Sequence, residues 1–118
     1  MSDPVLTEVR GNILIVTLNR PEAKNAANKA LAEGVAAAMD RLDSDNDLRV
    51  GIITGRGGCF CAGMDLKAVA DDPIAMGEML RALSRASRAI RRLPIPTIAR
   101  VQGAAIGGGC GLMVVCDF

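Results

Sequence analysis

Hydrophobic residues along the chain follow two different periods, which predict short strands that alternate with helices. Strand-like hydrophobic runs occupy residues 6–10 and 13–18, with Gly11-Asn12 between them. Glycine as the first residue of a two-residue loop suits a type II′ turn, so this segment is predicted to form a β-hairpin. Short buried strands are also predicted at residues 50–54 and 97–101.

Two longer segments have hydrophobic residues at helical spacing. The first covers about residues 28–42 and has Asn28 as its predicted N-cap. Its inner face is predicted to consist of Leu31, Val35, Ala38, Met39 and Leu42. The second covers about residues 73–93, with Pro73 in its first turn. Its inner face is predicted to consist of Met76, Met79, Leu80, Leu83, Ser87 and Ile90.

The order of these elements indicates the fold class. A third helix is expected to start inside the glycine run 103–111 and to continue through residues 112–116. The resulting order of strand, strand, helix, strand, helix, strand and helix predicts a layered α/β fold. A length of 118 residues suits one domain, so residues 1–118 are taken as part of a single domain. The chain stops at Asp117-Phe118, directly after an apolar helix, and we therefore expect further elements to be missing.

Composition adds an open question about apolar surface. Half of the residues are hydrophobic, which is a high fraction for so short a chain because small domains bury only part of their surface. Either the excess surface meets a partner subunit, a ligand or a missing remainder, or the many alanines account for it. A net charge of +1 favours neither nucleic acid nor membranes as partners. Only Phe60 and Phe118 are aromatic, which argues against stacking on single-stranded nucleic acid.

The chain contains no histidine, and this narrows the chemistry further. Histidine is the commonest general base and the commonest metal ligand in proteins. The four cysteines, Cys59, Cys61, Cys110 and Cys116, form no Cys-x-x-Cys pair, so no metal site is expected. The N-terminus lacks the layout of a signal peptide, and the longest uncharged run is shorter than the ~20 residues of a membrane helix. We therefore expect a cytoplasmic protein with free thiols.

Two glycine-rich loops are the candidates for chemistry. They comprise residues 60–66 and 103–110, and each follows a predicted strand and precedes a predicted helix. Backbone N–H groups at such a junction point outward with a helix dipole behind them. Two such loops brought together could hold one oxygen between two N–H groups, as in an oxyanion hole. Alternatively, the glycines only permit close packing of helix on strand. Neither loop carries a dinucleotide-binding or P-loop glycine pattern.

Three motifs make the pattern specific. They are Asn19-Arg20-Pro21-Glu22-Ala23-Lys24-Asn25-Ala26, then Phe60-Cys61-Ala62-Gly63-Met64-Asp65-Leu66, then Ile106-Gly107-Gly108-Gly109-Cys110, with Cys116-Asp117 after them. From about Thr7 to its last residue the chain resembles the N-terminal half of the enoyl-CoA hydratase/isomerase (crotonase) family. This resemblance implies an α/β crotonase-like spiral of strand-strand-helix units, truncated before the C-terminal helices. It also implies a coenzyme A thioester as substrate, with coenzyme A as part of that substrate and no separate cofactor or metal.

The resemblance also assigns roles to residues. The N–H groups of Met64 and Gly108 match the two catalytic donors of an oxyanion hole that stabilises a thioester enolate, each worth ~3 kcal/mol. Ala62, Asp65, Leu66 and Lys67 match the stretch along the pantetheine arm and adenine. Lys24 matches a segment near the coenzyme A nucleotide, where a cation suits phosphate; otherwise Lys24 is a solvated surface lysine.

Gly111 departs from the family pattern. Hydratases place a glutamate directly after Gly-Gly-Gly-Cys, whereas glycine has no side chain to act as acid or base. The second catalytic carboxylate of the family lies beyond Phe118. The resemblance implies hydration or isomerisation of an enoyl-CoA in fatty acid metabolism by a homotrimer or hexamer. The alternative is a catalytically incomplete acyl-CoA-binding or assembly fragment.

The remaining polar and reactive residues have more ordinary interpretations. Asp65 and Asp117 are the acids nearest the motifs in the sequence, and Asp65 is expected to cap the following helix or to order its loop. Cys61 and Cys110 are expected to be packing residues, since no neighbouring base is visible. An arginine stripe is interpreted as a solvated helix face, a coenzyme A phosphate contact, a subunit contact or, weakly, an RNA-binding face. It consists of Arg81, Arg85, Arg88 and Arg92.

Overall fold

The computed structural model describes residues 3–118 and contains one mixed sheet of strand order β1-β2-β3-β4. The strands are β1 (Val5–Arg10), β2 (Ile13–Leu18), β3 (Val50–Gly55) and β4 (Thr97–Arg100). The helices are the 3-10 turn η1 (Pro21–Ala23), α1 (Lys29–Ser44), α2 (Pro73–Arg92) and α3 (Gly108–Val114). All the predicted strands and helices are confirmed within two or three residues.

The hairpin forms as the turn chemistry predicts. β1 and β2 pair antiparallel with Arg10 opposite Ile13, which leaves a two-residue loop. Gly11 has a positive φ of 60°, whereas Asn12 is not among the residues with positive φ. This combination fits a type II′ turn, because a type I′ turn requires positive φ at both central residues.

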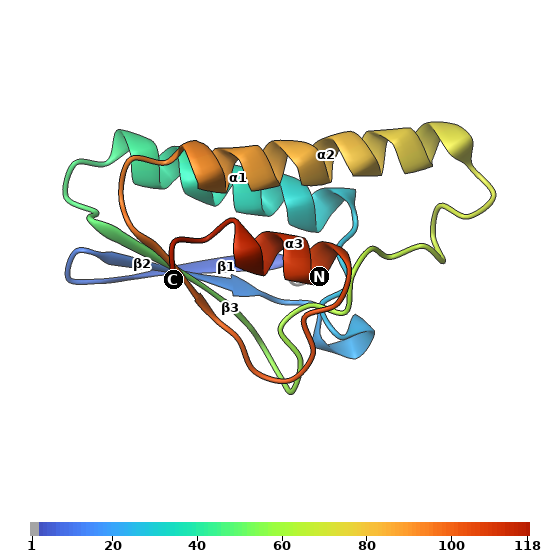
Figure 1. The fold of residues 1–118 in the computed structure, drawn as a ribbon, viewed down its shortest axis with the longest axis horizontal. Helices are drawn as coiled ribbons and strands as arrows, with labels where there is room; N and C mark the ends of the chain where they lie inside the picture. Colours follow the sequence, from blue (N-terminus) through green and yellow to red (C-terminus); the bar gives the residue numbers. More distant parts are fainter. Residues whose placement is uncertain (1–2) are drawn as a thin grey trace.

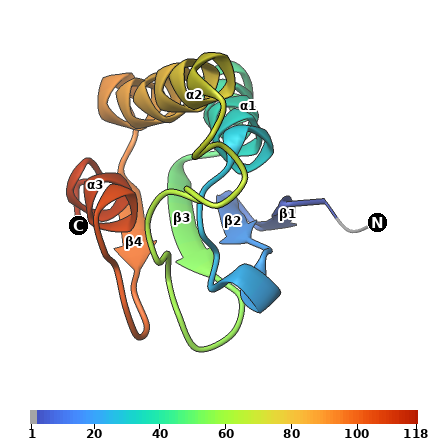
Figure 2. The ribbon, with the colours of Figure 1, turned by 90° about the vertical axis from the view of Figure 1, so that its right-hand side faces the viewer.

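Strands β2, β3 and β4 are parallel, and this arrangement positions the two glycine loops. The register places Leu18 beside Gly55, and Thr54 beside Arg100, so the carboxyl ends of the three strands lie at one edge of the sheet. Figures 1 and 2 show the segments that follow these ends gathered at the bottom of the molecule. In open α/β sheets this edge is the common place for ligands.

Helices α1 and α2 lie side by side on one face of the sheet, and α3 lies beside β4 (Figures 1 and 2). The sheet contributes buried Leu14, Val16, Leu18 and Ile53 to the core. Asn28 caps α1 as predicted, with its side chain accepting a hydrogen bond of 2.8 Å from the Leu31 N–H. The predicted inner face of α1 is confirmed, because its five members are all buried. The opposite face of the sheet leaves Ile98 exposed and Ile13, Ile15 and Ile52 half-buried.

The predicted inner face of α2 was partly wrong. Leu80 is 45% exposed, and the buried residues of the helix are Met79, Ala82, Ala86 and Ile90. Two of these four buried residues are alanines, Ala82 and Ala86. The predicted face correctly contained Met79 and Ile90, but it included Leu80 and left out Ala82 and Ala86.

Candidate functional site

Three loops at the carboxyl edge of the sheet are joined side by side by backbone hydrogen bonds. Cys61, in the loop after β3, forms a parallel bridge with Ala105, in the loop after β4. On the other side, Met64 forms a parallel bridge with Ala27, which follows η1. The loops therefore continue the β2-β3-β4 order beyond the ends of the strands.

The bridge with Ala27 fixes the direction of the Met64 amide. The Ala27 N–H donates to the Gly63 carbonyl at 2.7 Å, and the Asp65 N–H donates to the Ala27 carbonyl at 2.8 Å. In a parallel pairing of this kind, the residue between the two bonded neighbours directs its own N–H to the opposite side. The Met64 N–H therefore points away from Ala27, toward the side on which the second glycine loop lies.

Gly108 lies on that side, next to Met64. A methyl group placed on Gly108 would be 3.8 Å from the Met64 nitrogen and 3.5 Å from its Cγ. Gly108 is the first residue of α3, after Gly107 with its positive φ of 54°. The first N–H groups of a helix have no intrahelical acceptor. Across residues 3–118, neither the Met64 N–H nor the Gly108 N–H has a hydrogen-bond acceptor within the protein.

One part of the predicted geometry was wrong. Both amides were expected at a strand–loop–helix junction with a helix dipole behind them. Gly108 meets this expectation, but α2 begins only at Pro73, so no helix starts at Met64. The Met64 amide instead owes its direction to the bridge with Ala27, a contact between distant parts of the chain.

Most of the predicted coenzyme A-binding residues line one cavity of about 320 Å³ beside the first glycine loop. Its walls are formed by Ala23, Ala26, Ala62, Met64, Asp65, Leu66 and Lys67. Lys24 is exposed and lies instead at a neighbouring cavity of about 350 Å³, together with Arg56 and Cys59. The two cavities flank the η1 turn, which contributes Ala23 to the first and Pro21 to the second.

The carboxylates near the motifs already have partners. Asp65 Oδ2 accepts from the Arg20 guanidinium at 3.0 Å, so Asp65 orders its loop as expected. It does not cap α2, whose N-cap is Asp72. Asp117 Oδ2 accepts from the Thr97 N–H at 2.9 Å, at the opposite end of β4 from the glycine loops. Within residues 3–118 no group of three or more acidic or cysteine side chains could hold a metal.

Asn25 and Arg20 are the residues that sequence reasoning missed. Asn25 is fully buried with a positive φ of 56°, and its side chain bonds to the backbone of Arg20, Arg56 and Cys59. The asparagine thereby ties the η1 turn to the loop after β3. Both residues lie inside the Asn19–Ala26 motif, so their place in it was the available signal.

Cys61 is a buried packing residue, Cys116 packs against the core, and Cys59 lies at the cavity beside Lys24. All four are free thiols. Burial raises the pKa of the Cys61 thiol, with a smaller raising effect from Cys59. Burial also raises the pKa of the Cys116 thiol to about 11, and the Asp117 carboxylate adds to this. A thiol with a raised pKa is a poor nucleophile near neutral pH, which agrees with the packing role predicted for Cys61.

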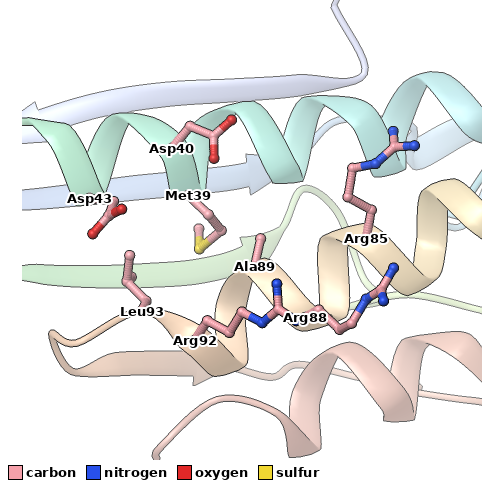
Figure 3. Close-up of a pocket in the computed structure, with 8 residues that line it drawn as sticks. All are labelled: Met39, Asp40, Asp43, Arg85, Arg88, Ala89, Arg92 and Leu93. Atoms are coloured by element: carbon pink, nitrogen blue, oxygen red, sulfur yellow. The ribbon is translucent and has the colours of Figure 1, made fainter.

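A further groove of about 360 Å³ lies between α1 and α2 (Figure 3). It contains three members of the arginine stripe, Arg85, Arg88 and Arg92, opposite Asp40 and Asp43. Because β4 starts just after α2 ends, this groove lies toward the amino ends of the parallel strands. The groove therefore does not bring these three arginines to the two glycine loops. All four arginines of the stripe are exposed, and a solvated face remains the simplest interpretation of them.

Known proteins match both the sequence and the fold. The family model described as Enoyl-CoA hydratase/isomerase matches residues 8–118. The enoyl-CoA hydratase EchA19 of Mycobacterium tuberculosis is 45% identical over 118 residues, which covers 95% of this chain and 44% of that protein. The chain therefore spans less than half the length of this curated relative. None of the described helices is long and apolar enough to cross a membrane.

Solved structures confirm the expected α/β crotonase-like fold. A probable enoyl-CoA hydratase/isomerase from Mycobacterium abscessus has a TM-score of 0.83 at 46% identity, covering 100% of this chain and 45% of that one. An enoyl-CoA hydratase/isomerase from Xanthobacter autotrophicus Py2 has a TM-score of 0.91 at 32% identity, covering 100% of this chain and 45% of that one.

Proposed function

The chain belongs to the enoyl-CoA hydratase/isomerase family, and we propose that it binds an acyl-CoA thioester and polarises its carbonyl with two backbone amides. The amides are those of Met64 and Gly108. In the complete protein they would stabilise the enolate that develops during hydration of an enoyl-CoA or migration of its double bond. Preorganised N–H donors of this kind stabilise developing negative charge without reorganising during the reaction.

The single observation that carries this proposal is the adjacency of two unoccupied amides. Bridges on both sides hold the loop between Cys61 and Met64, and Gly108 is in van der Waals reach of Met64. Neither N–H has an acceptor within residues 3–118, so one bound oxygen would satisfy both amides at once. A thioester carbonyl is such an oxygen, and its demand for hydrogen bonds increases as it becomes an enolate.

The neighbouring cavities support an assignment for the rest of the ligand. Residues 62–67 would lie along the pantetheine arm, whose largely apolar chain suits a cavity lined by Ala62 and Leu66. Lys24 and the nearby Arg56 would face the phosphates, because cationic side chains form strong charge-assisted hydrogen bonds with phosphate oxygens. Coenzyme A is part of the substrate in this proposal, and no metal or redox group takes part.

A second candidate is a catalytically incomplete acyl-CoA-binding or assembly fragment. Gly111 provides no side chain at the position where hydratases carry a glutamate. The carboxylates of Asp65 and Asp117 already accept hydrogen bonds from Arg20 and Thr97, respectively. Asp65 is the only acid among the residues that line the cavity beside Met64, and it is paired with Arg20. Under this candidate the chain binds the thioester without turning it over. We also propose that the protein forms a homotrimer or hexamer, as the family resemblance implies, and that it is cytoplasmic.

Proline at position 108 tests the proposal. Proline is tolerated in the first position of a helix and has no N–H, so Gly108→Pro deletes one donor. Gly108→Ala is the matched control, because its methyl group meets Met64 at ordinary contact distance and the N–H remains. We expect kcat on 2-enoyl-CoA substrates to be about 10²–10³-fold lower for the proline variant than for the alanine variant.

A titration with coenzyme A beside this assay separates the two candidates. Turnover by the 118-residue chain alone would eliminate the binding-only candidate, whereas binding without turnover would support it. Equal kcat values for folded Gly108→Pro and Gly108→Ala proteins would remove the oxyanion role of Gly108. Absence of coenzyme A binding by the complete protein would contradict both candidates.

A further inference from the structure

Arg20 holds both sides of the bridge that directs the Met64 amide. Its guanidinium donates to Asp65 Oδ2 at 3.0 Å, and a second guanidinium nitrogen donates to the Ala26 carbonyl. Ala26 directly precedes Ala27, and Asp65 directly follows Met64, so each of these contacts is one residue from a bridge partner. One side chain thus connects the segment after η1 with the loop after β3.

The connection is largely shielded from water. The side chains of Arg20 and Asp65 are only 19% and 17% exposed, whereas the ion pairs of Lys29 with Glu33 and Glu78 are about half exposed. Exposed pairs contribute little because water and salt screen them. Removing one partner of a shielded pair is costly, because the other charge is then left unpaired in a poorly solvated position.

Met64 has little else to hold its peptide group in place. Met64 is 36% exposed, and the chain from residue 66 to the start of α2 contains no helix or strand. The orientation of the Met64 N–H therefore depends on its two neighbours, Gly63 and Asp65, both bonded to Ala27. An oxyanion donor must be held within a few tenths of an ångström, since a displacement of about 1 Å can cost about 10²-fold in rate.

From this geometry we propose that Arg20 is a positioning residue for the Met64 amide. This inference rests on the proposed function, because it assigns Arg20 a part in the same oxyanion site. Arg20 has no contact with the thioester in this account. It acts by fixing Asp65 and Ala26, which in turn keep the Met64 N–H directed at the carbonyl oxygen.

The test uses the complete protein with a conjugated aromatic enoyl-CoA, whose absorbance shifts to longer wavelength when its thioester carbonyl is polarised. We expect Arg20→Met to lower kcat about 10- to 100-fold and to reduce this red shift, with less than about threefold change in coenzyme A affinity. Arg20→Lys keeps the charge but not the forked geometry of the guanidinium. Its kcat and red shift should therefore lie between those of Arg20→Met and those of the wild type. Lys29→Met, which removes two exposed ion pairs, is the matched control, and its kcat and red shift should equal those of the wild type.

A double variant separates positioning from general stability. Arg20→Met leaves the Asp65 carboxylate unpaired, so Arg20→Met with Asp65→Asn should regain much of the lost thermal stability. If Arg20 positions Met64, kcat and the red shift stay low in the double variant although its stability returns. Recovery of kcat together with stability would reduce Arg20 to a structural residue and overturn the proposal. Should Arg20→Met not fold, the same comparison applies to Arg20→Lys and its double variant.

The outcomes for the two proposals are distinct. A wild-type protein that shows neither turnover nor a red shift would contradict the proposed function itself. A wild-type protein with both signals and an Arg20→Met variant with unchanged kcat and red shift would contradict only the positioning role of Arg20.

Discussion

Gly109 packs directly against Cys61, and this contact seats the second glycine loop on the first. A methyl group placed on Gly109 would lie 2.8 Å from Cys61 Cβ and would also collide with the Cys61 carbonyl. Only glycine leaves room for the two backbones at this distance. The contact lies one residue from Gly108 and three from Met64, so it sets the separation of the two candidate donors.

Gly109→Ala is therefore expected to destabilise the protein and to impair the site. Overpacking against backbone atoms costs about 1–3 kcal/mol, and here it would also push α3 away from the first loop. Gly111→Ala in the same helix is the control, because nothing lies within 4 Å of its added methyl group. That variant should gain about 0.5–1 kcal/mol from reduced backbone entropy. Urea denaturation of both variants measures the difference, and equal stabilities would contradict the close contact.

Gly111→Glu is expected to fold and to increase hydration of 2-enoyl-CoA by the complete protein. The open space at Gly111 accommodates a longer side chain, and a carboxylate could then act on the attacking water. A well-placed general acid or base contributes about 10²–10⁴-fold, so an increase of even tenfold would indicate partial function. Gly111→Gln provides the control of similar size without a basic carboxylate. Identical hydration rates for the two variants would show that position 111 does not reach the substrate.

Asn25→Asp should destabilise the protein in a pH-dependent way. The buried Asn25 side-chain amide donates hydrogen bonds to the carbonyls of Arg56 and Cys59. An ionised carboxylate in its place has no hydrogen-bond donor and would lie against these two carbonyl oxygens. We expect a loss of about 3 kcal/mol at pH 7. The folded-state pKa of the new carboxyl would be raised, so the loss should shrink as the pH falls toward about 4. Exposed Asn46→Asp is the control, and a similar small effect for both would contradict the role of Asn25.

The raised pKa of Cys116 predicts slow alkylation of this thiol. Because its pKa is about 11 in the folded protein and 9.0 ordinarily, Cys116 stays protonated at pH 8–9. Iodoacetamide labelling followed by mass spectrometry should therefore find Cys116 much less reactive in native than in urea-unfolded protein. The folded state binds the Cys116 thiol proton more tightly than the unfolded state does. The stability that Cys116 contributes is therefore fully present below pH 9 and is lost as the pH rises toward 11. Cys116→Ala should lack this part of the alkaline instability.

Local patterns in the sequence were sufficient to predict the helices and strands. Hydrophobic spacing and cap or turn residues such as Asn28, Pro73 and Gly11 determine φ and ψ over a few neighbouring positions, so the structure reproduces those elements. The same patterns predicted the face that α2 buries only in part, because Met79 and Ile90 are buried as expected but Leu80 is not. The buried face depends on how α2 packs in the folded chain, which buries Ala82 and Ala86 and leaves Leu80 exposed.

The candidate site depends on contacts that no local pattern contains. The motifs identified Met64 and Gly108, but their adjacency follows from the parallel order of β2, β3 and β4, which brings three separate loops to one edge. Arg20 and Asp65 are 45 positions apart, and nothing in their spacing predicts an ion pair. Sequence alone specified the elements and the candidate donors because both are encoded in short segments. Only the folded chain could determine how the donors are directed, because that depends on backbone bonds between distant segments.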